Sequence, residues 1–331
     1  MRSTGTYSTT TTLGELVRAF VPRPLPPAKP ALAPDAYMAG VRGAELALAR
    51  LSGVSGLVPS MEWLLYSAIR KEALMTSQIE GTQATLTDLF DDEAGLLVSN
   101  TDDVQEVTNY LRAFRLVQHN LRKRRGLPIS VRLLCNAHRV LLNGARGSGK
   151  QPGELRRSQN WIGGSRPSKA EFVPPPPGRV PALLADLERF IHQPKPTLPP
   201  LVRIALVHVQ FETIHPFLDG NGRIGRLLIA ALMESWGLLS EPLMYISGTL
   251  KRYQAAYYQH LSAVRTQGDW EGWVSFFLQA VETAATEAER GIVAVASLVA
   301  ADRRRLLAAP RVGAVSLRLF ELLPMMRQRR R

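Results

Sequence analysis

His215-Pro216-Phe217-Leu218-Asp219-Gly220-Asn221-Gly222-Arg223-Ile224-Gly225-Arg226 is the stretch on which the fold and chemistry of this chain depend. An apolar helix is predicted to end just before it, because Pro216 prevents simple helical continuation. The triplet 220–222 allows backbone conformations that are closed to most residues. A second helix is predicted to begin there, so the stretch joins two helices through a tight turn.

The start of that second helix is a predicted anion site. Its first N–H groups have no partner within the helix, and they lie at the positive end of the helix dipole. Arg223 and Arg226 fall in this first turn, where cations are unfavourable for the helix itself. Two arginines beside a glycine turn and a helix start suit a polyphosphate.

Two further side chains complete the pattern. Asp219 would repel a phosphate unless a cation lay between them, and a carboxylate beside phosphates is a good Mg²⁺ ligand. His215 has an ordinary pKa near neutrality, so it could take a proton from an attacking hydroxyl. The alternative is a plain corner between helices with solvated arginines. That alternative explains each residue separately but explains the whole constellation poorly.

Helical spacing of apolar residues continues on both sides of the turn. The sequence predicts helices over residues 38–51, 60–79, 103–122, 130–142, 180–192, 200–213, 222–236, 249–266 and 270–295. The segment 144–177, rich in Gly, Ser and Pro, interrupts this rhythm. Within it, 160–162 and 171–173 are predicted to form a small β-hairpin around a glycine turn. The predicted fold class is mainly α with one small hairpin.

The bulk composition sets wide limits. The chain has 331 residues, 45% hydrophobic and 21% charged, typical of a globular protein with a sizeable core. Its single cysteine cannot form an internal disulfide, which favours a reducing cytoplasm. The apolar runs are too short for a membrane span. The net charge of +13 permits binding to nucleic acid, anionic lipid or phosphate ligands but selects none of them.

The stretch 215–226 matches the motif HPFx[D/E]GNGRxxR at every specified position, and the chain therefore resembles the Fic family. The resemblance implies a helical Fic-type bundle with a β-hairpin flap. It also implies a protein adenylyltransferase that moves AMP from ATP to a Ser, Thr or Tyr hydroxyl of a target protein. His215 would be the general base and Asp219 the Mg²⁺ ligand. The nucleotide would contact Gly220, Asn221, Gly222, Arg223, Gly225 and Arg226.

A second segment, Thr76-Ser77-Gln78-Ile79-Glu80-Gly81, resembles the family's inhibitory motif [S/T]xxxE[G/N]. Thr76, Glu80 and Gly81 occupy its specified positions, at the end of an inhibitory helix spanning about 60–80. The resemblance implies a bidentate Glu80–Arg226 pair that denies Arg226 to the γ-phosphate. Glu80 could also serve hydrolytic removal of AMP, an alternative that the sequence leaves open.

Two further regions resemble functional parts of the family. The segment 152–164 is similar to the flap, so Asn160, Trp161, Ile162 and Gly163 are expected to hold a target segment by strand addition. An ordinary surface hairpin is the alternative. Tyr257 and Tyr258 are expected to border the adenine, although adjacent helical residues point to different faces, so only one would stack on it. Core packing is the alternative for either tyrosine.

The expected organisation has four parts. Residues 1–34 form an N-terminal arm, with 1–12 disordered and 21–34 proline-rich; 35–125 form an N-terminal helical region. Residues 126–285 form the Fic catalytic core, and 286–331 form C-terminal helices that resemble a truncated winged-helix module near 315–326. ATP and Mg²⁺ are the expected cofactors, and a homodimer is implied by the resemblance. No membrane partner is expected, and the incomplete module does not favour nucleic acid.

Other functions remain open. UMP, phosphocholine or phosphate transfer are chemistries that the same family carries out, although the complete GNGRxxR string favours attack on the α-phosphate of a triphosphate. A nucleic-acid-binding regulator would fit the positive charge. A segment with P-loop spacing, 144–150, is followed by Gln151 where Ser or Thr should hold Mg²⁺, and it is predicted to be a flexible loop.

Overall fold

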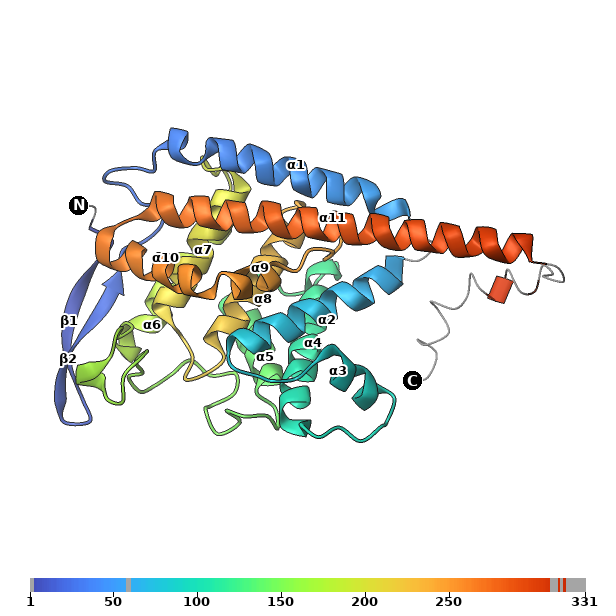
Figure 1. The fold of residues 1–331 in the computed structure, drawn as a ribbon. Coiled ribbons are helices and arrows are strands. Elements are labelled where there is room, and N and C mark those ends of the chain that lie inside the picture. The colour runs from blue at the N-terminus through green and yellow to red at the C-terminus, as the bar shows by residue number, and fades with distance from the viewer. Residues whose placement is uncertain (1–2, 58–60, 310–314, 316–317, 320–331) are drawn as a thin grey trace.

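The computed structural model describes residues 3–57, 61–309, 315, 318 and 319. Helices dominate these residues and confirm the predicted mainly α fold (Figure 1). The helices are α1 Met38–Val54, α2 Met61–Ile79, α3 Leu86–Glu93, α4 Thr101–Arg122, α5 Val131–Leu141, α6 Val180–Ile191, α7 Pro200–Ile214, α8 Asn221–Ser235, α9 Ile246–Arg252, α10 Gln254–Gln267 and α11 Trp270–Ala308. Among these residues no helix combines the length and the apolar character that a membrane span requires.

The core is built around α7. Every residue from Leu201 to Ile214 is buried, which explains why this segment reads as apolar on all sides rather than on one stripe. Helices α1 and α11 run side by side across one side of the molecule, and α8 follows α7 through the quoted turn (Figure 1). The turn is therefore held between two rigid, buried elements.

The C-terminal part of the chain differs from the expectation. Residues 286–308 do not form separate helices, because α11 continues without a break for 39 residues. None of its residues after Ile292 is buried, so this end of the helix projects from the body (Figure 1). The resemblance to a winged-helix module at 315–326 falls almost entirely outside the described residues.

One other helical expectation was wrong. The helix predicted over 249–266 is broken at Tyr253 into α9 and α10. The short helix α3 was not predicted, and the acidic run Asp91-Asp92-Glu93 ends it. That helix begins with a capping box, in which Thr85 and Asp88 satisfy each other's backbone N–H groups.

The prediction that residues 1–12 are disordered was wrong for residues 5–12. Strand β1, Gly5–Thr12, pairs antiparallel with β2, Glu15–Pro22. Leu13 and Gly14 both have positive φ and form the two-residue turn between the strands. The Thr-rich strand β1 buries few apolar side chains of its own, but Thr favours extended structure. Its partner β2 supplies the buried side chains Val17, Ala19 and Phe20.

The predicted hairpin between 160–162 and 171–173 is reduced to one antiparallel bridge, Ile162 with Phe172. Glycines at 163 and 164, both with positive φ, make the turn region. The N-terminal hairpin lies against this segment, because Phe20 N–H donates to the Val173 carbonyl at 2.9 Å. The two-stranded sheet of the described residues is thus the N-terminal hairpin rather than the flap.

Candidate active site

His215 closes α7 in a left-handed conformation, with φ 50° and ψ 62°. This conformation is uncommon for a residue with a side chain, and the surroundings must hold it. Arg156 does so, since its Nε donates to the His215 carbonyl at 2.8 Å and its backbone N–H donates to the Pro216 carbonyl at 2.9 Å. The backbone of His215 is therefore fixed from outside its own helix.

The His215 ring is prepared to act as a base. Its Nδ1 lies 3.3 Å from the Glu212 carbonyl, which can only accept, so Nδ1 carries the hydrogen. Nε2 is then left with a free lone pair. Burial lowers the pKa of His215 to about 4, against a smaller opposite effect of that hydrogen bond. The imidazole is therefore neutral at physiological pH.

The turn after His215 is closed by Asn221. Its Oδ1 accepts from Phe217 N–H and its Nδ2 donates to the Phe217 carbonyl, both at 2.9 Å. Gly220 precedes α8 with φ 75°, a conformation that favours glycine. Both polar atoms of the Asn221 side chain are thus bound to Phe217, and the backbone N–H of Asn221 lies at the start of α8.

The start of α8 offers the predicted anion site. Ile224 N–H is the first in the helix to reach a backbone carbonyl, that of Gly220. The three preceding amides, of residues 221–223, have no backbone acceptor among the described residues. Donors left in this way at a helix start attract a negative group.

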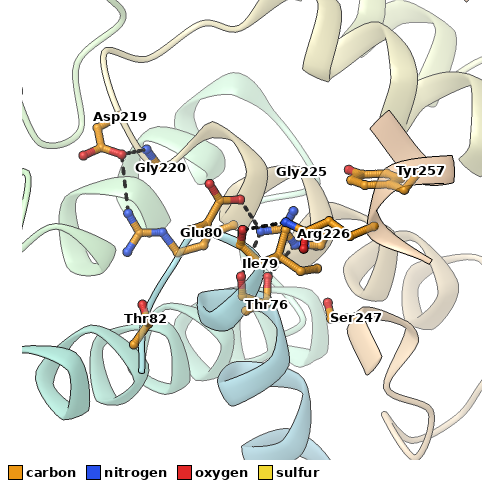
Figure 2. A network of polar contacts seen from close by, with 12 residues as sticks. Thr76, Ile79, Glu80, Thr82, Asp219, Gly220, Gly225, Arg226, Ser247 and Tyr257 are labelled. Atoms are coloured by element: carbon orange, nitrogen blue, oxygen red, sulfur yellow. Dashed lines mark hydrogen bonds and ion pairs between the residues drawn. The ribbon is translucent and has the colours of Figure 1, made fainter. Parts of the chain in front are cut away.

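A negative group from the chain itself already lies there. The Glu80 carboxylate lies so close to Gly222 that a Cβ on that glycine would collide with Glu80 Oε1. Glu80 Oε1 also accepts from Arg226 Nη2 at 2.6 Å (Figure 2). Burial would raise the pKa of Glu80, but Arg226 and other cations outweigh burial and lower it. Glu80 is therefore held as a charged carboxylate.

Arg226 is buried to 1% exposure and is held mainly by α2. Its Nε donates to Thr76 Oγ1 at 2.6 Å, and its Nη2 also donates to the Thr76 carbonyl at 3.0 Å. The expected bidentate contact with Glu80 was wrong, because one oxygen of Glu80 meets one nitrogen of Arg226. Thr76 accepts from Nε, so no side-on pair through Nε and Nη2 forms with Glu80. Gly81, with φ 98°, follows Glu80 and ends the helical run.

Asp219 lies at the other side of the helix start (Figure 2), where Arg223 contacts it. Asp219 Oδ1 accepts from Gly220 N–H at 2.5 Å and lies 3.5 Å from Arg223 Nη2. Its side chain is 39% exposed, whereas that of Arg223 is 3% exposed. Arg223 is bound on its far side by Glu106, a buried carboxylate of α4.

Gly225 faces away from this site. A Cβ there would meet the carboxylate of Glu212 and the ring of His208, both on α7. The prediction that Gly225 contacts the nucleotide therefore has no support in its placement. Its lack of a side chain allows α7 and α8 to approach closely.

The two tyrosines have different surroundings. Tyr257 is 1% exposed, and its hydroxyl donates to His208 Nε2 at 2.8 Å. Its ring packs in the core, so its face is not free for a base. Tyr258 is 46% exposed. Burial and the Glu80 carboxylate raise the pKa of Tyr258, and its ring centroid lies 5.2 Å from that of Tyr257.

The residues that were predicted to form the flap lie next to the turn that follows His215. Asn160 Nδ2 donates to the Phe217 carbonyl at 3.0 Å, so the flap segment is tied to the motif loop. Ile162 is 36% exposed. Trp161 packs against a small cluster formed by Val17 and Ala19 of the N-terminal hairpin and by Val173. Gly163, with φ 69°, belongs to the turn.

Sequence reasoning assigned no role to two residues that support this site. Glu106 lies outside the recognised segments, and Arg156 lies in the segment that resembles the flap without a role of its own; only the tertiary structure brings both to the site. His138 is a buried histidine next to the turn. It accepts from Gly153 N–H at 2.8 Å and donates to the Asp219 carbonyl at 3.0 Å.

Comparison with known proteins agrees with the geometry. A family model described as "Fic/DOC family N-terminal" matches residues 38–118, and one described as "Fic/DOC family" matches residues 128–233, together more than half of the chain. Proteins named "Protein adenylyltransferase Fic" from Drosophila sechellia and Drosophila melanogaster are 27% identical over 208 residues. The match covers 62% of this chain and 39% of each relative, so the chain spans about two fifths of their length.

Solved structures show the same architecture. A Fic family protein from Desulfovibrio desulfuricans has a TM-score of 0.66 at 25% identity, covering 88% of this chain and 85% of that protein. Fic-1 from C. elegans has a TM-score of 0.62 at 20% identity, covering 80% and 75% respectively. The second likeness supports the fold alone.

Proposed function

The chain belongs to the Fic/DOC family, and on that premise we propose that it is a protein adenylyltransferase kept inactive by its own Glu80. It transfers AMP from ATP to a Ser, Thr or Tyr hydroxyl of a target protein. The observation that carries this proposal is the neutral His215 imidazole beside an anion site at the start of α8. Relatives with the name "Protein adenylyltransferase Fic" support the choice of AMP.

The reaction follows from the positions of the groups. His215 Nε2 takes the proton of the target hydroxyl, whose oxygen forms a bond to the α-phosphorus of ATP. The bond from that phosphorus to the bridging oxygen breaks, and pyrophosphate leaves. The amides of 221–223 and the guanidinium of Arg223 stabilise the charge on the phosphates. The flap aligns the target hydroxyl with the α-phosphorus, and this alignment supplies the rest of the rate enhancement.

Asp219 is suited to hold Mg²⁺. Its Oδ1 accepts from Gly220 N–H, and its Oδ2 receives no hydrogen bond from the described residues. In the part of the chain that the structure describes, no three metal-binding side chains gather in one place. Mg²⁺ commonly binds one or two carboxylates and takes its other ligands from phosphates and water, so Asp219 together with the phosphates of ATP would hold it. When bound, the ion would neutralise phosphate charge.

Autoinhibition rests on competition between two anions. The Glu80 carboxylate packs against Gly222 and accepts a hydrogen bond from Arg226. The distal phosphates of ATP would need to bind in the same place. With Arg226 engaged, ATP cannot place its γ-phosphate there, and the α-phosphate loses its alignment with His215. Release of Glu80 would open the site.

Further assignments are part of the same proposal. Tyr258 contributes an exposed ring for the adenine, and Asn160 to Gly163 hold the target segment. The catalytic core spans 126–285, preceded by the helical region 35–125 that carries the inhibitory helix. A homodimer and a cytoplasmic location complete the proposal.

The test compares two labels. The Glu80→Gly variant is incubated with a cell lysate and with ATP labelled at either the α- or the γ-phosphate. AMP transfer marks proteins with the α-label and not with the γ-label, and the same variant carrying His215→Ala serves as control. Retention of the γ-label would instead indicate phosphate transfer, and equal labelling by the His215→Ala control would exclude His215 as the base.

A further inference from the structure

Glu106 is a carboxylate that is almost completely enclosed by the protein, at 1% exposure. It lies on α4, outside both recognised motifs. Burial of a charged carboxylate is unfavourable unless it is paired and hydrogen-bonded. Three segments supply its partners: Thr82 after α2, Arg146 from the loop after α5, and Arg223 from α8.

The contact with Arg223 fixes one side of that guanidinium. Arg223 Nη1 lies 3.3 Å from Glu106 Oε2, and Nη2 lies 3.5 Å from Asp219 Oδ1. The guanidinium is thus shared between two carboxylates. Without Glu106, Asp219 would be its one carboxylate partner among these contacts, and arginine favours a close, two-point pair with a carboxylate. Such a pair would neutralise Asp219 and draw Arg223 away from the phosphates.

Glu106 also fixes the loop at residues 146–147, which lies beside the other carboxylate oxygen of Asp219. Arg146 Nε lies 2.9 Å from Glu106 Oε1. The next residue, Gly147, has φ 89°, and a Cβ there would lie 2.6 Å from Asp219 Oδ2. The loop that limits the space around Asp219 is therefore bound to the same buried carboxylate as Arg223.

We propose that Glu106 is a positioning residue that holds Arg223 apart from Asp219, which keeps Asp219 available to Mg²⁺ and Arg223 available to the nucleotide phosphates. This inference rests on the proposed function, because it assumes that the site binds Mg²⁺ with a nucleotide. Glu106 touches neither of these itself. It acts through Arg223 and through the loop at 146–147.

The test measures nucleotide binding rather than turnover. A non-hydrolysable ATP analogue is titrated by calorimetry into the Glu80→Gly protein, with and without Glu106→Gln, over a series of Mg²⁺ concentrations. Residues that orient a metal ligand typically change metal affinity by about tenfold or more. We expect the Mg²⁺ concentration for half-maximal binding to rise by about that factor in Glu106→Gln.

Two comparisons separate positioning from general damage. Thr82→Val removes a hydrogen bond to Glu106 but leaves Arg223 in place, so binding should stay within about twofold. In a protein that carries Arg223→Gln, adding Glu106→Gln should cause no more than about a twofold further loss, because the two residues act as a unit. If Glu106→Gln does not fold, Glu106→Asp takes its place, since it keeps the charge and moves it away from Arg223.

Unchanged Mg²⁺ dependence in a folded Glu106 variant would overturn the inference, and so would fully additive losses with Arg223→Gln. A different result concerns the proposed function: if the Glu80→Gly protein binds no nucleotide at any Mg²⁺ concentration, the transferase assignment itself fails. The inference would fail with it.

Discussion

Glu80 Oε1 lies 2.6 Å from Arg226 Nη2, across 146 residues of sequence. This contact joins the end of α2 to the first turn of α8. Arg226 is buried, and Thr76 on the same helix α2 binds its Nε. Thr76 therefore positions Arg226, and Glu80, four residues later at the end of α2, pairs with its Nη2. In the proposed inhibition, a small movement of Glu80 would therefore end its contact with Arg226 while Thr76 keeps Arg226 in place.

Removal of Glu80 should activate the enzyme. We expect Glu80→Gly to raise the rate of self-labelling with α-labelled ATP by roughly tenfold or more, equivalent to about 1.4 kcal/mol of activation free energy. Glu80→Gln keeps an oxygen acceptor but loses the charge, so it should give a smaller increase. Initial rates at saturating ATP provide the measurement. An unchanged rate in Glu80→Gly would remove the inhibitory role.

The pH dependence of the activated enzyme should reflect the low pKa of His215. A base must be neutral, and burial lowers the pKa of His215 to about 4. The rate of Glu80→Gly should therefore stay nearly constant as the pH falls from 8 to about 6, with half of it lost only near pH 4 to 5. Initial rates across this range test the prediction, with circular dichroism confirming that the protein stays folded. Half-loss near pH 6.5 would contradict it.

Tyr257 and Tyr258 should respond in opposite ways. Tyr257→Phe leaves the buried Nε2 of His208 without its donor, at a cost of about 1–3 kcal/mol in the free energy of unfolding, with ATP affinity little changed. Tyr258→Ala removes an exposed ring, so stability should hold while ATP affinity falls by several fold. Urea denaturation and nucleotide titration measure the two effects. If ATP affinity falls in Tyr257→Phe and not in Tyr258→Ala, then Tyr257 and not Tyr258 contacts the adenine.

His208 should make the protein sensitive to acid. Burial lowers its pKa to about 3, with Arg226 acting in the same direction; Tyr257 and Trp273 also face the ring. The unfolded chain binds a proton at this residue below about pH 6.5 and the folded chain does not, so stability is lost as the pH falls below 6.5. Between pH 7 and pH 5 this amounts to about 2 kcal/mol.

The matched variant for this prediction is His208→Gln, which has no group that titrates in this range. The loss of unfolding free energy between pH 7 and pH 5, measured by urea denaturation, should be smaller in the variant by about 2 kcal/mol. An equal loss in the two proteins would show that His208 does not contribute.

The sequence by itself determined the features that depend on neighbouring residues. Pro216 and Gly220 place the turn between α7 and α8, and the order from His215 to Arg226 then places a base, a carboxylate and two guanidinium groups around one helix start. These relations need only local backbone geometry. Most helices also follow from the local periodicity of apolar residues.

The tertiary structure alone decided what binds those groups. Nothing near Arg223 in the sequence indicates that Glu106, 117 residues away, would hold it, nor that Arg156 would fix the backbone of His215. The strand at Gly5–Thr12 likewise depends on its partner β2 and on the flap beneath it. Burial, pairing of charges and strand pairing are set by which distant segments meet, and local sequence patterns do not contain that information.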